Sequence, residues 1–244
     1  MQNSEIILFD IPSKGRCSCW SPNTWKTRLV LNYKQLPYRT EWLEYPDIAP
    51  ELAALGIQTN PPGSWADYSC PAIRLPDGEH IMDSQKIVEK LEQLHPEPSL
   101  YLDTKVHESV YGAVASTIDA SISTIIPAAQ RNILREPSAS WHAADRERRF
   151  GKSLEQLEED EGGEKAWDAV KHGLEALKAE LSKHKRDDGP FVLGGTVSYG
   201  DFLIAGFFEW LKRADDTLYE RFIGYDASFK EHHEACQPCL AKDD

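Results

Sequence analysis

The residues best placed to do chemistry lie in one short stretch, Trp20-Ser21-Pro22-Asn23-Thr24. Proline is favoured at the first position of a helix, where its missing N–H is not needed, so Ser21 is expected to be the N-cap. Free backbone N–H groups and the positive end of the helix dipole meet at that position. They favour a bound anion, including a thiolate. Taken alone, however, a serine before a proline is more often an ordinary helix cap.

Two further pairs of residues share this character. Cys70 and Pro71 directly precede a short apolar run, Ala72-Ile73-Arg74-Leu75, which is typical of a β-strand. Asp83 and Ser84 precede a helical pattern, so their side chains lie beside the free N–H groups of a helix start. Such a site suits a carboxylate, and the Asp83 carboxylate can pair with an ammonium group. Each pair alone is a weak signal, because helix caps and X-Pro bonds are common.

The five cysteines are odd in number and scattered, at positions 17, 19, 70, 236 and 239. They do not suggest a disulfide framework, and we expect reduced thiols. Cys236 and Cys239 follow His232 and His233, a grouping that could suggest zinc. A structural zinc site usually needs two ligand pairs on ordered loops, whereas this group lies near the C-terminus. We therefore expect no metal, and ordinary thiols in a surface tail.

Charge and hydropathy exclude several classes of partner. The chain has 244 residues, with 40 acidic and 27 basic side chains and a formal net charge of −13. Nucleic acid and anionic membranes would be repelled by this charge. No apolar run approaches the roughly 18 residues of a membrane span, and the N-terminus lacks the features of a secretory signal. The sequence therefore predicts a cytoplasmic protein with no nucleic-acid or membrane partner.

The first part of the chain alternates short strands and helices. We expect strands at 6–9, 39–44, 72–75 and 80–82, and helices at 22–34 and 84–94. The segment 45–68 is rich in proline, glycine and asparagine, and is expected to be a loop with a short helical piece near 50–55. The order βαβ followed by ββα predicts a mixed sheet with helices. We assign residues 1–95 to an α/β domain.

The second part has helical periodicity and no strand signals. Residues 96–104 are expected to be a linker, and 105–244 an all-α domain. Ser198-Tyr199-Gly200-Asp201 has the pattern of a capping box, for which we expect a structural role. The expected helices cover 106–134, 144–159, 164–184, 201–214 and the stretch beyond 219.

Taken together and in this order, these motifs resemble those of the cytosolic glutathione transferase superfamily. The resemblance covers nearly the whole chain, and the stretch from Trp20 to Tyr33 with Glu44-Tyr45-Pro46-Asp47-Ile48 looks most like the fungal etherase-like, fuscata-type class. It implies a thioredoxin-like N-terminal domain and an all-helical C-terminal domain. It also implies glutathione as co-substrate and a homodimer.

The resemblance further implies how glutathione is held. Asp83 and Ser84 would bind its γ-glutamyl end, and the backbone of Cys70, before a cis Pro71, would bind its cysteinyl amide. The glycyl end would meet the 45–68 loop, where Gln58 is our candidate donor.

The thiol of glutathione would face Ser21, with Asn23 as a supporting donor. A free thiol is only a few per cent ionised at neutral pH, and a hydrogen bond from Ser21 would favour the thiolate. The thiolate would attack a hydrophobic or aromatic electrophile, by conjugation or ether cleavage. The acceptor site would be apolar and lie between the domains, with Tyr111 and Ile118 from the 106–134 helix.

Three alternatives remain open at this stage. If Cys19 rather than Ser21 faces glutathione, thiol transfer becomes the reaction. A glutathione-dependent isomerase or lyase, in detoxification or secondary metabolism, would use the same thiolate. A protein that only carries hydrophobic ligands would share the fold, because fold does not fix function.

Overall fold

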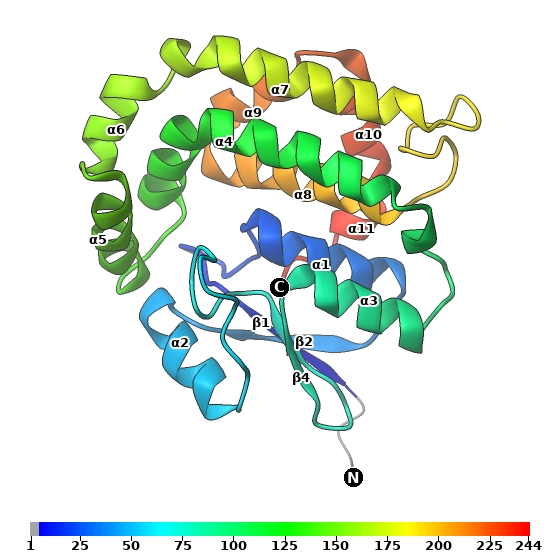
Figure 1. Cartoon of the computed structure of the whole chain (residues 1–244), viewed down its shortest axis with the longest axis horizontal. Coiled ribbons are helices and arrows are strands. Elements are labelled where there is room, and N and C mark those ends of the chain that lie inside the picture. Colours follow the sequence, from blue (N-terminus) through cyan, green and yellow to red (C-terminus); the bar gives the residue numbers. More distant parts are fainter. Residues whose placement is uncertain (1–4) are drawn as a thin grey trace.

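The computed structural model describes residues 5–244. Its N-terminal domain is a four-stranded sheet in the order β2-β1-β3-β4, in which β1 runs parallel to β2 and antiparallel to β3. Helices α1 and α3 lie between this sheet and the rest of the protein, and α2 lies beside it (Figure 1). The elements are β1 (Ile6–Asp10), α1 (Pro22–Tyr33), β2 (Tyr38–Trp42), α2 (Tyr45–Ala54), β3 (Ala72–Arg74), β4 (His80–Met82) and α3 (Ser84–Leu94).

The C-terminal domain is helical, and it stacks on α1 and α3 (Figure 1). This architecture confirms the predicted fold, an α/β domain followed by an all-helical one. The elements are the 3₁₀ turn η1 (Leu102–Thr104), α4 (Val106–Asn132), α5 (Ser138–Phe150), α6 (Leu154–Glu161), α7 (Glu164–Lys183), α8 (Tyr199–Ala214), α9 (Asp216–Ile223), α10 (Ala227–Ala235) and α11 (Gln237–Leu240).

Two helix predictions were wrong. The short helical piece expected near 50–55 is the longer helix α2, which begins at Tyr45, because Pro46 and Asp47 lie in its first turn, where proline and an acidic residue favour a helix start. The single helix expected at 144–159 is two helices. Gly151, with φ of 72°, ends α5, and the Ser153 side chain caps α6 by accepting from the Gln156 N–H.

Helix α8 fixes the position of α1. Its residues from Tyr199 to Leu211 are all buried. A Cβ placed on Gly206 would lie 3.0 Å from the Trp25 Cβ and 3.3 Å from the Pro22 carbonyl oxygen. Glycine therefore allows α8 to pack directly against the first turn of α1, which begins the functional site.

Helix α4 meets the requirement for a membrane span by length and composition alone. From the sequence we expected no segment that could span a membrane. In the structure α4 packs against α6, α7 and α8, and its residues Val110, Val114 and Ile125 belong to the core. Packing within the protein accounts for this apolar character.

Candidate functional site

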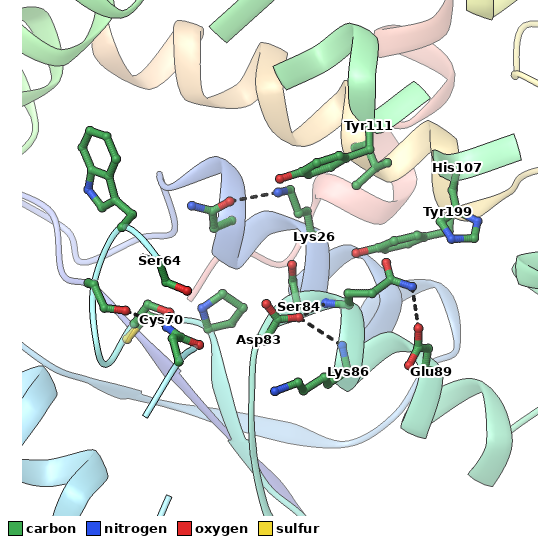
Figure 2. Close-up of a pocket in the computed structure, with 18 of the residues that line it drawn as sticks. Lys26, Ser64, Cys70, Asp83, Ser84, Lys86, Glu89, His107, Tyr111 and Tyr199 are labelled. Atoms are coloured by element: carbon green, nitrogen blue, oxygen red, sulfur yellow. Dashed lines mark hydrogen bonds between the residues drawn. The ribbon is translucent and has the colours of Figure 1, made fainter. Parts of the chain in front are cut away.

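A cavity of about 980 Å³ lies between the two domains. Side chains from α1, from the segment before β3, from the start of α3, and from α4 and α8 converge on it (Figure 2). They are Asn23, Lys26, Asn60, Pro61, Ser64, Trp65, Ala66, Ser69, Cys70, Pro71, Asp83, Ser84, Gln85, Lys86, Glu89, His107, Glu108, Tyr111, Tyr199 and Leu203.

Ser21 is the N-cap of α1, as its position before Pro22 predicts. Its Oγ accepts a hydrogen bond from the Asn23 N–H at 3.3 Å. Within residues 5–244 no acceptor is found for the Ser21 hydroxyl proton, so this proton is available to a ligand. Ser21 is only 6% exposed and is not itself among the lining residues, whereas Asn23 is. The first turn of α1 thus meets the cavity through Asn23, with Ser21 directly before it.

The two cysteines near Ser21 do not line the cavity. Cys19 is fully buried, and its Sγ lies 3.3 Å from the Thr24 Oγ1. Burial raises the pKa of the Cys19 thiol well above its usual value and also raises the pKa of Cys17. A thiol that is buried and protonated is a poor nucleophile. This placement gives no support to thiol transfer at Cys19.

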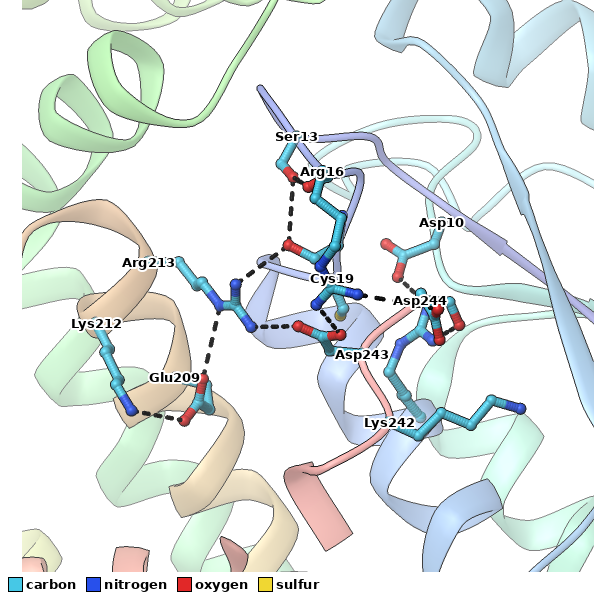
Figure 3. A network of polar contacts seen from close by, with 12 residues as sticks. Asp10, Ser13, Arg16, Cys19, Glu209, Lys212, Arg213, Lys242, Asp243 and Asp244 are labelled. Atoms are coloured by element: carbon cyan, nitrogen blue, oxygen red, sulfur yellow. Dashed lines mark hydrogen bonds and ion pairs between the residues drawn. The ribbon is translucent and has the colours of Figure 1, made fainter.

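The loop before Ser21 is fastened by the C-terminal segment (Figure 3). The Cys19 N–H donates to the Asp243 carbonyl oxygen at 2.7 Å, and the Asp243 carboxylate pairs with Arg16 and with Arg213, the latter at 2.6 Å. Arg213 belongs to α8, so this contact joins both domains and the loop.

The C-terminal segment is not the surface tail that the sequence suggested. Cys236 is 2% exposed, and the Cys239 carbonyl oxygen accepts from the Asn32 Nδ2 at 2.6 Å. The prediction was wrong because Phe229 and Leu240 belong to the core, so the segment packs against the rest of the protein. Within residues 5–244 no group of three or more potential ligands is arranged to hold a metal ion.

The turn before β3 has the predicted cis Cys70–Pro71 peptide bond. Both residues line the cavity, and the Pro71 carbonyl oxygen accepts from the Asp83 N–H at 3.3 Å. This bond places the start of α3 beside the turn. Burial raises the pKa of the Cys70 thiol well above its usual value, which favours the protonated thiol over the thiolate.

Asp83 alone is the N-cap of α3, and Ser84 is its first helical residue. The Asp83 Oδ1 accepts from the Gln85 N–H at 2.8 Å and from the Lys86 N–H at 3.2 Å. Within residues 5–244 the other carboxylate oxygen has no hydrogen-bond partner, so it can accept from an ammonium group. Asp83 has a φ of 91°, a region that non-glycine residues seldom occupy.

The segment before β3 forms the wall opposite α3. The Asn60 Nδ2 bridges this segment by donating to the Ala66 carbonyl oxygen at 2.9 Å and to the Ser69 Oγ at 3.3 Å. Gln58, our candidate for the glycyl end, is exposed and lies outside the cavity lining. Asn60 and Ser64 reach the cavity instead, two and six residues further along the chain. Sequence position alone could not locate which polar side chain of this loop points inward.

The helical domain contributes more polar groups than expected. Tyr111 lines the cavity as predicted, but Ile118 does not, because the cavity meets only the first turns of α4. His107 and Glu108 also line it, and Tyr199 faces Ser84 from α8 (Figure 2). Burial raises the pKa of Tyr199 above its usual range, and a hydrogen bond with Ser84 opposes this shift.

Sequence reasoning missed two lining residues that carried a signal. Tyr199 lies inside the capping box that we regarded as purely structural. Lys26 follows Asn23 by three residues, which places the two side chains on one face of α1. The Lys26 Nζ donates to the Asn23 Oδ1 at 2.9 Å, and burial lowers the pKa of Lys26 to about 8.

Comparison with known protein families gives two matches. Residues 20–94 match the family "Glutathione S-transferase, N-terminal domain", and residues 106–220 match "Glutathione S-transferase, C-terminal domain". The glutathione S-transferase-like protein ustS of Aspergillus flavus is 29% identical over 238 residues, which are 91% of this chain and 86% of that protein.

Solved structures of fungal proteins are similar over nearly the whole chain. Glutathione transferase GSTFuA3 from Phanerochaete chrysosporium is 29% identical, with a TM-score of 0.85, covering 96% of this chain and 97% of its own. A glutathione S-transferase of Ceriporiopsis subvermispora, solved in complex with glutathione, is 30% identical with the same TM-score and the same coverage.

Proposed function

Because this chain belongs to the cytosolic glutathione transferase superfamily and is of the fungal type, we propose that it transfers glutathione to an electrophile by means of Ser21. Glutathione is its co-substrate. The observation that carries the proposal is the meeting of two helix N-termini at one cavity. The start of α1 presents Asn23, directly after the N-cap Ser21, and the start of α3 presents Asp83 and Ser84.

In this proposal the peptide is held along the N-terminal domain. The free oxygen of Asp83 binds the α-ammonium group, and Ser84 binds the α-carboxylate of the γ-glutamyl residue. The backbone of Cys70, turned by Pro71, pairs with the cysteinyl amide. Ser64 is better placed than Gln58 for the glycyl carboxylate, because it lines the cavity and Gln58 does not. Asn60 also lines the cavity, but both protons of its Nδ2 are already donated within the loop, so it positions this wall instead.

Ser21 then stabilises the thiolate. Its hydroxyl donates a hydrogen bond to the sulfur, and the N-terminal end of α1 adds the favourable dipole. Asn23 supplies a further hydrogen-bond donor. Lowering the thiol pKa by about two units requires roughly 2.7 kcal/mol, which two such contacts can supply. Ser21 itself is not the nucleophile, because no histidine of residues 5–244 is hydrogen-bonded to its Oγ to serve as its base.

The reaction follows from the thiolate. Its sulfur forms a bond to an electrophilic carbon of the acceptor, and the electron pair leaves on an ether oxygen or a halide, or moves along a carbon–carbon double bond that then takes a proton from water. The side chains of α4 and α8 form the acceptor side of the cavity.

Titration of the bound thiol tests the role of Ser21. Glutathione bound to the wild-type protein should show thiolate ultraviolet absorbance about two pH units below free glutathione, and Ser21→Ala should return most of this shift while leaving glutathione affinity within a few-fold. Cys19→Ala is the control, and its titration should match the wild type. If bound and free glutathione ionise at the same pH, the serine mechanism is wrong.

We also propose that the protein is a cytoplasmic homodimer, as most relatives of this superfamily are. Light scattering on the purified protein should give twice the chain mass of 27.6 kDa. A monomer mass would remove the dimer from the proposal without affecting the chemistry of the cavity.

A further inference from the structure

Lys26 is a buried cation without an anionic partner. Its side chain lies on α1 and is only 7% exposed, yet it lines the cavity. Its ammonium group has three protons to donate, and within residues 5–244 its one hydrogen-bond acceptor is the neutral Asn23 Oδ1 at 2.9 Å. No carboxylate of these residues lies within 4.0 Å of it. Lysine is almost never buried unless it is paired, so this ammonium lacks a counter-charge.

The surroundings of Lys26 show where a counter-charge would sit. The Lys26 Nζ lies 5.2 Å from the centre of the Tyr111 ring, which belongs to the helical domain. Figure 2 shows Lys26 pointing into the space between Tyr111 and the Asp83–Ser84 turn. Desolvation lowers the pKa of Lys26 to about 8, and the more distant Asp83 only partly offsets this. The ammonium thus faces the boundary between the peptide-binding wall and the acceptor side.

We propose that Lys26 is a specificity residue that binds a carboxylate of the acceptor, so that the preferred electrophiles are anionic. This inference rests on the proposed transferase function. The acceptor is favoured over glutathione as the source of the carboxylate because the ammonium contacts Asn23, beside the expected sulfur, and Tyr111, on the acceptor side. The proposed function already assigns the γ-glutamyl carboxylate to Ser84. The polar side chains of His107 and Tyr199 also suit a charged acceptor better than a purely apolar one. The Glu108 carboxylate on the same side would repel an anion, which leaves Lys26 as the group that holds the acceptor's carboxylate.

A matched pair of electrophiles tests the proposal. One is trans-4-phenyl-3-buten-2-one with a para-carboxylate on the ring, and the other carries a para-carboxamide of the same size. In both, the sulfur adds to the β-carbon and the α-carbon takes a proton from water. A charge-assisted hydrogen bond contributes about 10-fold to 100-fold in affinity. We therefore expect Lys26→Met to lower kcat/KM for the carboxylate by at least about 10-fold and to change it for the carboxamide by less than about 3-fold.

Lys86→Met is the matched control. Lys86 also lines the cavity, but it is exposed, so loss of its charge should change the carboxylate-to-carboxamide ratio by less than about 3-fold. Lys26→Gln serves as a second variant if Lys26→Met does not fold. If the ratio of kcat/KM for the carboxylate to that for the carboxamide is equal in the wild type and in Lys26→Met, the proposal is wrong. The measured turnover would still support the transferase function. Equal losses for both ketones, with glutathione binding at least about 10-fold weaker, assign the ammonium to glutathione and also overturn it.

Failure of the transferase function is recognised separately. If the wild type turns over neither ketone, calorimetry with the saturated carboxylate and carboxamide analogues, on glutathione-loaded protein, decides the role of Lys26. Tighter binding of the carboxylate that is lost in Lys26→Met supports the anion site. Equal binding of the two analogues overturns it.

Discussion

Helices α1 and α8 both begin at a serine N-cap, but the two ends differ in how they are completed. At α8 the Asp201 carboxylate accepts from the Ser198 N–H and from the Val192 N–H, each at 2.7 Å, and it lies 3.1 Å from the His232 Nε2. At α1 the Ser21 side chain accepts one long hydrogen bond, and the first turn has no acidic residue. We call the N-terminal end of α8 closed, because the protein itself supplies its hydrogen-bond partners, and the N-terminal end of α1 open, because it does not.

The difference shows how one sequence signal serves two purposes. A serine before a helix reports only that backbone N–H groups need partners. Where an acidic residue follows three positions later, as Asp201 follows Ser198, the chain supplies those partners itself and the helix end contributes stability. Where none follows, as at α1, the positive end of the helix remains available to a ligand. Lys26 increases the positive charge on that open side.

We expect the greatest loss of stability when the acceptor at the closed end of α8, Asp201, is removed. Asp201 is fully buried, so Asp201→Ala leaves two backbone N–H groups and His232 without their acceptor. We expect a loss of about 3–5 kcal/mol in the free energy of unfolding, measured by urea denaturation. Asp215→Ala is the control, because that N-cap accepts only from the Leu218 N–H, and it should cost about 1 kcal/mol. A loss at position 201 no larger than the control would mean that the two helix ends do not differ as described.

The second prediction concerns the stability of a variant that lacks the Lys26 charge beside the open end of α1. Burial lowers the pKa of Lys26 from 10.5 to about 8, so the unfolded chain binds more protons than the folded one between these values. Stability therefore rises with pH across this window, and below it the charged lysine costs about 3 kcal/mol. Lys26→Met should accordingly be more stable than the wild type at pH 7, by up to about 3 kcal/mol, with the gap closing toward pH 10.5. Urea denaturation at both pH values measures it, and a variant less stable at pH 7 contradicts an unpaired ammonium.

The sequence predicted the fold because its signals are local. Pro22 after Ser21, and the apolar periodicity of α8, each specify an element without reference to distant residues. The same local rules were misread where proline occurs inside a helix start, as at Pro46. The Ser21 cap and the Asp83 cap were predictable for this reason, whereas the cis Pro71 bond was expected only from the family resemblance.

The inward-facing side chains were less predictable. Gln58 and Asn60 are equivalent by composition, and only the folded path of the loop decides that Asn60 lines the cavity. Lys26 looks like an ordinary surface lysine in the sequence, because its surroundings come partly from the other domain, where the Tyr111 ring of α4 lies 5.2 Å from its Nζ. Which residues share a cavity is a tertiary property, and no local pattern carries it.

The last prediction compares the two N-cap serines, Ser21 and Ser198, whose loss should change stability least. Ser198→Ala removes a hydroxyl that donates to Asp201 at 2.8 Å, whereas Ser21→Ala removes one that, within residues 5–244, is bonded only to the Asn23 N–H at 3.3 Å. We expect Ser198→Ala to cost about 1 kcal/mol in the free energy of unfolding and Ser21→Ala clearly less. Turnover should respond in the opposite order, with kcat falling at least about 10-fold for Ser21→Ala and less than about 3-fold for Ser198→Ala, because the proposed function places the reacting sulfur at Ser21 and not at Ser198. Denaturation and steady-state kinetics on the same two variants measure both quantities. If both serines affected stability and turnover alike, the distinction between a closed and an open helix end would have no functional meaning in this protein.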